Sequence, residues 1–337
     1  MKRILPLFLA LALLLTGCAA VSTTESTSQT VSQVDSPSSA LESAPESASS
    51  QLESISITDS NGSQITLDTS APRVVAAYGS FAEAWLLAGG ELCGVTQDAL
   101  EQRDLGLPED IAVVGTVKEP NAEEIIALEP DLVLLASDIT AHADIRDVLE
   151  NAGLACAFFQ VDTFADYAFM MEQLCAITGR EDLYEENVTQ VGQQIEEAQA
   201  NAALSSTRPN VLLIRAFSTG IKAKTDDELA GVILQDLGAH NIADDHPSML
   251  EDLSLEEVIA ANPDYIFVTT MGDEQKALEY LNGLIDQNPA WSQLSAVQEG
   301  RYIVLPKDLF HYKPNNRWGE SYQYLGEILY PEFFDEA

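Results

Sequence analysis

An internal repeat constrains the fold of this chain more than any other feature of its sequence. Residues 121–137 read NAEEIIALEPDLVLLAS and residues 254–270 read SLEEVIAANPDYIFVTT, with six of 17 positions identical at an offset of 133 residues. That offset is several times the period of a solenoid repeat, so it indicates two duplicated lobes rather than an array of short units.

Each copy of the repeat predicts a helix that leads into a strand. In the first copy, Asn121 can cap the helix, Glu124 can close a capping box and Pro130 ends the helix before an apolar run. The corresponding residues of the second copy are Ser254, Glu257 and Pro263. The repeat therefore predicts the same helix-to-strand unit in both lobes.

Apolar runs separated by helical stretches continue this pattern along the chain. Such runs are typical of parallel strands that are buried on both faces of a sheet. They span residues 74–78, 92–96, 111–114, 132–136, 155–161, 211–217, 221–224, 265–270 and 302–305. Ahead of them, alternating residues on either side of Asn61-Gly62 predict a β-hairpin.

The charged segment 181–204 contains apolar residues near helical spacing and no proline, which predicts the longest helix of the chain. The sequence therefore predicts an α/β protein with two Rossmann-like lobes and parallel-rich sheets. The lobes are residues 55–180 and 205–337, and the single long helix joins them.

The N-terminus has the organisation of an export signal. Lys2 and Arg3 precede an apolar stretch that is too short to span a membrane, and Leu15-Thr16-Gly17-Cys18 follows. This arrangement resembles a bacterial lipoprotein signal, which implies removal of residues 1–17 and a lipid on Cys18. An ordinary secretory signal with a chance cysteine is the alternative. Residues 18–54 are rich in Ser and Thr and predict a disordered tether.

Charge and cysteine content narrow the classes of partner. The chain has 16 Lys plus Arg against 54 Asp plus Glu, a net charge of -38, and loss of Lys2 and Arg3 takes this to about -40. A field of that sign repels nucleic acid and anionic lipid head groups. Cys93, Cys156 and Cys175 lie in apolar contexts and are expected to be buried free thiols.

Together these features resemble the substrate-binding proteins of ABC importers for iron complexes and vitamin B12. The resemblance begins near Pro72 and rests on PRVVAAYGSFAEAWLLAGG at 72–90, both repeat copies, the long helix and NPAWSQLSAVQEGRYIVLPKDLF at 288–310. It implies a ligand crevice between the lobes, beyond the carboxyl ends of the strands. It also implies an extracytoplasmic, lipid-anchored monomer without a cofactor of its own. Such a protein passes a small-molecule ligand to an ABC permease and ATPase complex.

The resemblance assigns a role to two acidic residues. Glu123 and Glu256, the first Glu of each repeat copy, match the pair that in this family meets arginines of the permease. A carboxylate in the first turn of a helix also offsets the helix dipole, which is the alternative explanation. Because Glu124 and Glu257 already serve the predicted caps, a second acid at the same place in both lobes favours docking.

The ligand-binding residues are predicted from the loops that should face the crevice. Cations are scarce in this chain, yet several of them lie in two loops of the second lobe, near rings that could contact a ligand. The predicted set is Tyr78, Ser80, Phe81, Lys118, Arg215, Lys222, Lys224, His311, Tyr312, Lys313, Arg317 and Trp318. Arg317 opens a predicted helix, where the dipole disfavours a cation, so either an anionic ligand or nearby Glu320 should neutralise it.

This set fits an anionic iron complex, either a ferric siderophore or haem. A His or Tyr side chain, such as His311 or Tyr78, could ligate haem iron while Arg and Lys pair with its propionates. A siderophore would need only charge and aromatic faces. A corrinoid is the alternative ligand and would depend more on Tyr78, Phe81 and Trp318.

Other functions find less support. His142 and His311 are too few for a carrier of bare transition-metal ions, and His240 and His246 are expected to lie on the surface. The chain has no G-x-S-x-G, H-E-x-x-H, G-x-x-x-x-G-K-[ST] or G-x-G-x-x-G motif, so we predict that it is not an enzyme. A lipoprotein enzyme of unknown reaction remains the outside alternative.

Overall fold

The computed structural model describes residues 54–334 except 70, 252 and 254. Residues 1–17, Cys18 and nearly all of the predicted tether lie outside this range. Within the described residues, no helix combines the length and the apolar character needed to cross a membrane.

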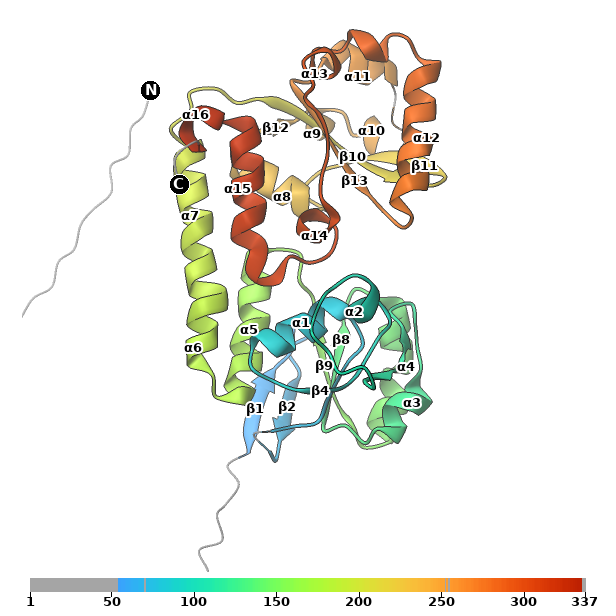
Figure 1. The fold of residues 1–337 in the computed structure, drawn as a ribbon, viewed down its shortest axis with the longest axis vertical. Coiled ribbons are helices and arrows are strands. Elements are labelled where there is room, and N and C mark those ends of the chain that lie inside the picture. The colour runs from blue at the N-terminus through green and yellow to red at the C-terminus, as the bar shows by residue number, and fades with distance from the viewer. Residues whose placement is uncertain (1–53, 70, 252, 254, 335–337) are drawn as a thin grey trace, which may run out of the picture. The chain divides into compact units, whose positions relative to one another are not determined.

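The first lobe contains a parallel five-stranded sheet in the order β5-β4-β3-β8-β9 (Figure 1). Its strands are β3 (Val74–Ala76), β4 (Leu92–Val95), β5 (Ala112–Val113), β8 (Leu132–Ala136) and β9 (Ala155–Phe159). Two antiparallel pairs accompany it: β1 (Ile55–Thr58) with β2 (Gln64–Leu67), and β6 (Gly115–Thr116) with β7 (Glu119–Pro120). The helices are α1 (Gly79–Leu87), α2 (Asp98–Glu101), α3 (Ala122–Ala127), α4 (Thr140–Asn151) and α5 (Phe164–Thr178).

Burial on both faces explains the continuous apolar runs of this sheet. All five residues of β8 are buried. Leu132 and Leu134 belong to the apolar cluster on one face, and Val133 and Leu135 to the cluster on the other. This is the arrangement expected of a parallel strand covered by helices on both sides.

The second lobe has a five-stranded sheet in which β11-β10-β13-β14 are neighbours and β12 also pairs with β10. Its strands are β10 (Asn210–Phe217), β11 (Gly220–Lys224), β12 (His240–Asn241), β13 (Tyr265–Thr270) and β14 (Tyr302–Val304). Its helices are α8 (Leu229–Asp236), α9 (Ile242–Asp245), α10 (Ser248–Glu251), α11 (Leu255–Ala261), α12 (Glu274–Gln287), α13 (Ser295–Gln298), α14 (Lys307–Phe310), α15 (Trp318–Leu329) and α16 (Pro331–Phe334), with 3₁₀ turns η2 (Trp291–Gln293) and η3 (Asn315–Arg317). Only β11 runs antiparallel, because a two-residue turn joins it to β10 and cannot form a parallel crossover.

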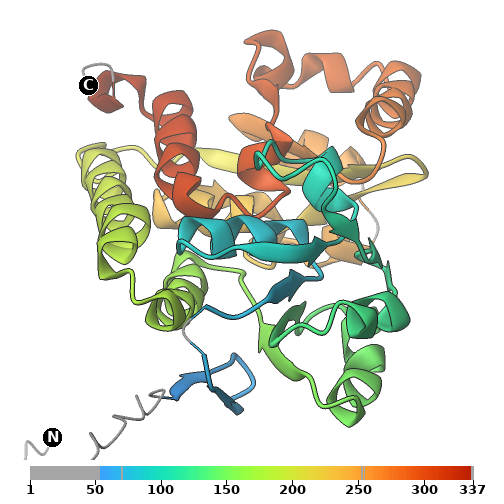
Figure 2. The same ribbon diagram turned by 60° about the horizontal axis from the view of Figure 1, so that its bottom comes forward.

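Residues 181–202 form one helical run between the lobes, consisting of α6 (Glu181–Tyr184), the π-helical turn η1 (Glu185–Thr189) and α7 (Gln190–Ala202). Helix α15 lies beside α7, as Figures 1 and 2 show. Val191 and Ile195 of α7 share an apolar cluster with Tyr322 and Leu325 of α15. The chain thus passes between the lobes along a helix that is braced by a second helix.

The two repeat copies have the same local structure. Glu129 and Asn262, each directly before the shared Pro-Asp pair, both adopt left-handed backbone conformations, with φ of 47° and 44°. The Asp131 carboxylate then accepts a hydrogen bond from the Arg73 backbone N–H (2.7 Å), and Asp264 accepts one from Asn210 (2.8 Å). In each lobe, the Asp of the repeat, which lies directly before the strand of the helix-strand unit, therefore ties that unit to the start of the lobe's first core strand.

The predicted fold class is confirmed: the structure is mixed α/β, with parallel-rich sheets in two lobes. The helix predicted to open at Arg317 begins at Trp318 and ends at Leu329. The π-helical turn within residues 185–189 was not predicted.

Candidate functional site

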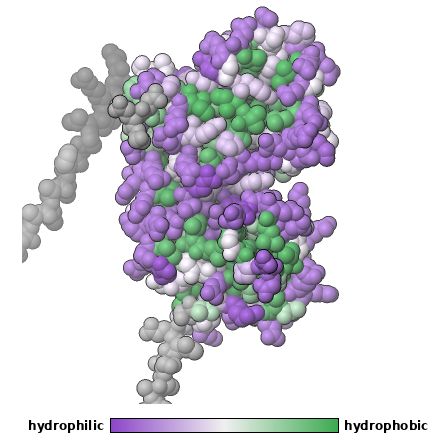
Figure 3. Space-filling view, in the orientation of Figure 1, coloured by the Kyte–Doolittle hydropathy of each residue, from purple (hydrophilic) through white to green (hydrophobic). Residues whose placement is uncertain are grey.

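The candidate site is the recess between the two lobes, which Figure 3 shows with hydrophilic side chains on both sides of its mouth. Tyr78 follows β3 and Asp138 lies beyond β8 in the first lobe, whereas Met271 and Lys307 follow β13 and β14 in the second. These positions are at the carboxyl ends of parallel strands, where ligands of open α/β sheets bind.

A group of cations lies on the β10–β11 hairpin of the second lobe. Arg215 and Lys222 are cross-strand partners. The Glu228 side chain, only 1% exposed, forms ion pairs with Arg215 and with the Lys224 ammonium, the latter at 3.5 Å. Burial raises the pKa of Glu228, and the two cations only partly oppose this. The Lys222 side chain is exposed and forms no hydrogen bond or ion pair with the part of the chain that the structure describes.

His311 lies near this group and carries no charge at neutral pH. Burial, together with the nearby positive charges of Arg215, Lys307 and Lys313, lowers its pKa to about 4. Its Nδ1 is buried and finds no hydrogen-bond partner within the described residues. The ring lies 5.2 Å from that of Tyr312, centroid to centroid. His311 therefore offers a neutral imidazole to whatever enters this part of the recess.

Tyr78 is the predicted ligand-binding ring of the first lobe that stays partly exposed. The pKa of Tyr78 is raised to about 12, mainly by burial; Arg103 lowers it, and Asp138, Asp98 and Asp162 raise it. Tyr78 is therefore a neutral phenol that can donate a hydrogen bond at physiological pH.

Two predicted ligand-binding rings belong to the core instead. Phe81 is 1% exposed and contacts the rings of Tyr78 and Phe159, at 5.3 and 6.4 Å. Trp318 is fully buried, and its ring lies 6.3 Å from that of Phe164. The prediction that these rings contact a ligand is wrong for this structure, because each lies on the inward side of the first turn of its helix.

Two other predicted ligand-binding side chains are engaged inside the protein. Ser80 is buried, and its Oγ donates to Asn315 Oδ1 at 3.3 Å. Lys313 donates to the Val161 carbonyl and to Asp162 Oδ1, the latter at 3.2 Å. Neither group is available to a ligand without the loss of these contacts.

Arg317 is neutralised by protein acids rather than left for an anion. Its guanidinium lies 2.7 Å from Asp308 Oδ2 and 2.8 Å from Glu320 Oε2. These acids resolve the conflict between Arg317 and the helix dipole, so this conflict no longer argues for an anionic ligand. Lys118, in the turn between β6 and β7, is exposed and has no partner among the described residues.

The segment 311–317, which we call the lobe-bridging loop, belongs to the second lobe in sequence but is bonded to the first. Asn315 Nδ2 donates to the Ser80 carbonyl (2.9 Å) and to Glu83 Oε2 (2.6 Å). Arg103 donates to the Lys313 carbonyl at 2.9 Å and forms an ion pair with Glu83. Sequence reasoning missed Glu83, Arg103 and Asn315, because no local motif marks contacts between residues so far apart in the chain.

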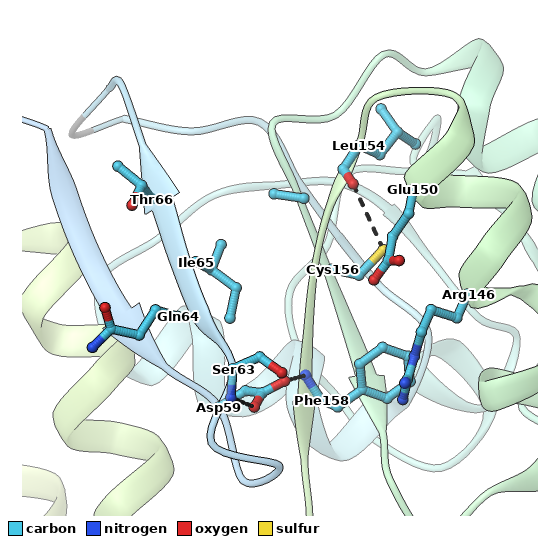
Figure 4. A pocket seen from close by; sticks show the side chains of 11 residues that line it. Asp59, Ser63, Gln64, Ile65, Thr66, Arg146, Glu150, Leu154, Cys156 and Phe158 are labelled. Carbon is cyan, nitrogen blue, oxygen red and sulfur yellow. Dashed lines mark hydrogen bonds between the residues drawn. The ribbon is translucent and has the colours of Figure 1, made fainter.

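Two cavities are lined by residues other than Arg215, Lys222 and Lys224. One, of about 150 Å³, lies where the lobes meet and is lined by Glu83, Arg103, Tyr312 and Arg317 among others. The other, of about 300 Å³, lies between β2, β9 and α4, at the edge of the first sheet. Figure 4 shows Arg146 over the ring of Phe158 in this second cavity, 4.1 Å from its centroid. Neither cavity offers the volume expected for a ligand as large as haem.

The described residues contain no group of three or more His, Cys, Asp or Glu side chains placed to hold a metal ion. His142, one of the histidines considered above, is fully buried and bonds to backbone groups of Ala136 and Val117. Cys93, Cys156 and Cys175 are free, the first half-buried and the others buried.

The predicted docking residues lie on the surface. Glu123 is exposed in the first turn of α3, where Asn121 Oδ1 accepts hydrogen bonds from the Glu123 and Glu124 N–H groups. Glu256 is exposed in the first turn of α11, while its predicted cap, Ser254, lies outside the described residues. The Glu257 carboxylate accepts hydrogen bonds from Ser248 Oγ at 3.1 and 3.2 Å.

Relatives of this chain are known. It is 25% identical over 270 residues to the Fe(3+)-citrate-binding protein YfmC of Bacillus subtilis, covering 77% of this chain and 81% of that protein. Its fold matches Staphylococcus aureus IsdE complexed with heme (TM-score 0.63, 18% identity, 77% and 99% coverage). It also matches S. aureus SirA complexed with staphyloferrin B (TM-score 0.61, 19% identity, 83% and 98% coverage). Residues 74–309 match the family described as periplasmic binding protein, and the chain belongs to that family.

Proposed function

We propose that this protein captures an anionic iron complex outside the cytoplasmic membrane and delivers it to the permease and ATPase of an ABC importer. Its relative YfmC is named as a ferric citrate-binding protein, and SirA and IsdE were solved with a siderophore and with heme. A ligand carrier of this kind needs no catalytic group and no cofactor of its own. The observation that carries the proposal is the cation group of Arg215, Lys222 and Lys224 beside the recess.

This cation group matters because the rest of the chain is so acidic. A recess lined by one sign of charge focuses the field and draws in ligands of the opposite sign, even where the global field repels them. The neutral imidazole of His311 and the phenol of Tyr78 add two groups able to contact a metal complex. A corrinoid finds less support, because two of the three rings on which it would depend, Phe81 and Trp318, are buried.

Titration of the purified protein with ferric citrate, an anionic ferric siderophore, haemin and cobalamin tests this function. We expect the tightest binding for one of the anionic iron complexes. Arg215→Gln should weaken that binding by about tenfold or more, since hydrogen bonds to charged groups contribute about 1.5–3 kcal/mol each, and added salt should reduce the difference.

The matched control is Arg208→Gln, an exposed arginine whose Nε donates to the Gly238 carbonyl away from the recess. It should leave all four affinities unchanged. Nanomolar binding of cobalamin that is indifferent to Arg215→Gln would replace the iron complex with a corrinoid as the ligand.

The anchor is a separate part of the proposal and rests on the sequence around Cys18. Cys18→Ser should release the protein from membranes, because the lipidated side chain would be gone, and ligand affinity should not change. The measurement is the fraction of protein that sediments with membranes after a high-salt wash. If the variant sediments as the wild type does, Cys18 is not the anchor.

A further inference from the structure

Glu228 occupies an unusual position for a buried acid. It is the N-cap residue of α8, with extended backbone angles (φ −131°, ψ 144°), yet its side chain makes no capping hydrogen bond. The carboxylate is directed instead at the β10–β11 hairpin, where only 1% of the side chain is exposed. Because this carboxylate contacts two cations and not the N–H groups at the start of α8, its role is not that of a helix cap.

Its two partners come from neighbouring strands. Arg215 of β10 and Lys224 of β11 converge on the carboxylate, with side chains 23% and 21% exposed. Within the described residues, Arg215 Nε is buried and lacks a hydrogen-bond partner, and the buried Glu228 Oε1 has the Lys224 ammonium at 3.5 Å. The carboxylate is therefore held by two opposite charges rather than by a full set of hydrogen bonds.

Because Glu228 is buried, its negative charge acts on the neighbouring cations more strongly than the charges of the other nearby acids do. Asp227 also forms an ion pair with Lys224, but its side chain is 54% exposed, so water screens it. Asp226 is exposed as well. A charge in a low-dielectric environment acts on its neighbours several times more strongly than one at the surface. Glu228 is thus the acid that most limits the positive potential of the cation group.

We propose that Glu228 is a specificity-determining residue of the recess: its buried carboxylate offsets part of the charge of Arg215, Lys222 and Lys224 and so limits how much negative charge a ligand can bring. This inference rests on the proposed function, because it concerns the same site. It implies that the site discriminates between iron complexes by charge, and that Glu228 sets the preference.

Glu228→Gln tests this directly. Glutamine can still accept a hydrogen bond from Arg215, but the local charge rises by one unit. At low salt we expect ferric citrate to bind about tenfold or more tightly than to the wild type, since one added unit charge acts at close range in low dielectric. A neutral ferric trihydroxamate complex should change by about twofold at most, and 0.5 M NaCl should shrink the gain for ferric citrate.

Asp227→Asn is the matched control, because it removes an acid that contacts the same lysine from a solvated position. It should change ferric citrate affinity by no more than about twofold. A second pair of variants covers the case in which Glu228→Gln folds poorly. Arg215→Gln with Glu228→Gln, which leaves no carboxylate in the ion pair, should bind ferric citrate about tenfold more tightly than Arg215→Gln alone.

The outcomes separate the two proposals. If Glu228→Gln and the double variant weaken binding of ferric citrate, or change both complexes equally, Glu228 merely holds Arg215 and the inference is overturned. If neither the wild type nor any variant binds an anionic iron complex, the proposed function itself fails. Unfolding curves for every variant establish that the affinities compare folded proteins.

Discussion

Reversing the charge of both Glu123 and Glu256 to lysine should abolish import of the ligand while leaving its binding unchanged. The two acids are exposed at equivalent points of the duplicated lobes, each in the first turn of its helix. In the family that the chain resembles, such a pair meets arginines of the permease. Lysine would turn two attractions into two repulsions, and like charges brought together at an interface cost several kcal/mol.

Uptake of radiolabelled iron complex by cells expressing each variant measures this effect, and titration of the purified proteins checks binding. Glu124→Gln is the control, because Glu124 is exposed one residue further along the same helix. It should support normal uptake. Uptake at the wild-type rate by the double lysine variant would show that these acids do not dock the permease.

Much of the fold could be predicted from the sequence because the signals are local. Continuous apolar runs separated by helical stretches predict parallel strands that are buried on both faces. Strands β8 and β13 lie where such runs predict them. The repeat predicted two lobes, although the role of its Asp could not be foreseen. Asp131 and Asp264 bind backbone N–H groups 58 and 54 residues away, and no periodicity marks such a partner.

The site was harder to predict, for a physical reason. Arg215, Lys222 and Lys224 lie together because one hairpin holds them, and their contact with a ligand stays a prediction. Phe81 and Trp318 were expected near the ligand but lie in the core. A ring at the start of a helix can face either the ligand or the core, and the packing of the helix, which the sequence does not show, decides between them. Glu228 was missed because one acid among 54 does not stand out in the sequence, and only its burial distinguishes it.

Asn315 supplies the remaining prediction, because it joins lobes that are far apart in sequence. Its side chain is fully buried, and its amide makes three hydrogen bonds to Ser80 and Glu83, residues 235 and 232 positions away. Its backbone is left-handed, with φ of 52°, a conformation that asparagine tolerates better than most residues. Both the side chain and the backbone of this position are thus fitted to the junction between the lobes.

Asn315→Ala should lower the free energy of unfolding by about 3–4 kcal/mol. Unpaired buried partners cost about 1–3 kcal/mol, and alanine lacks the short polar side chain that lets asparagine tolerate a left-handed backbone, whose cost is about 1–2 kcal/mol. Asn315→Gly separates the two terms: glycine adopts the positive φ freely, so it should lose only the hydrogen bonds, about 2 kcal/mol. Urea denaturation measures both values. Asn316→Ala, which removes a half-buried bond to Asn187 (3.1 Å), is the neighbouring control and should cost about 1 kcal/mol or less.

The same variants test how the lobes move. A single helical run between the lobes provides no pair of flexible strands to act as a hinge, and the lobe-bridging loop adds bonds that do not depend on ligand. We therefore expect the wild type to close by only a few degrees when ligand binds, and Asn315→Gly to change more in small-angle X-ray scattering. Equal scattering changes in both proteins would mean that the helix alone limits closure. An Asn315→Ala variant within about 1 kcal/mol of the wild type would show that the loop does not join the lobes.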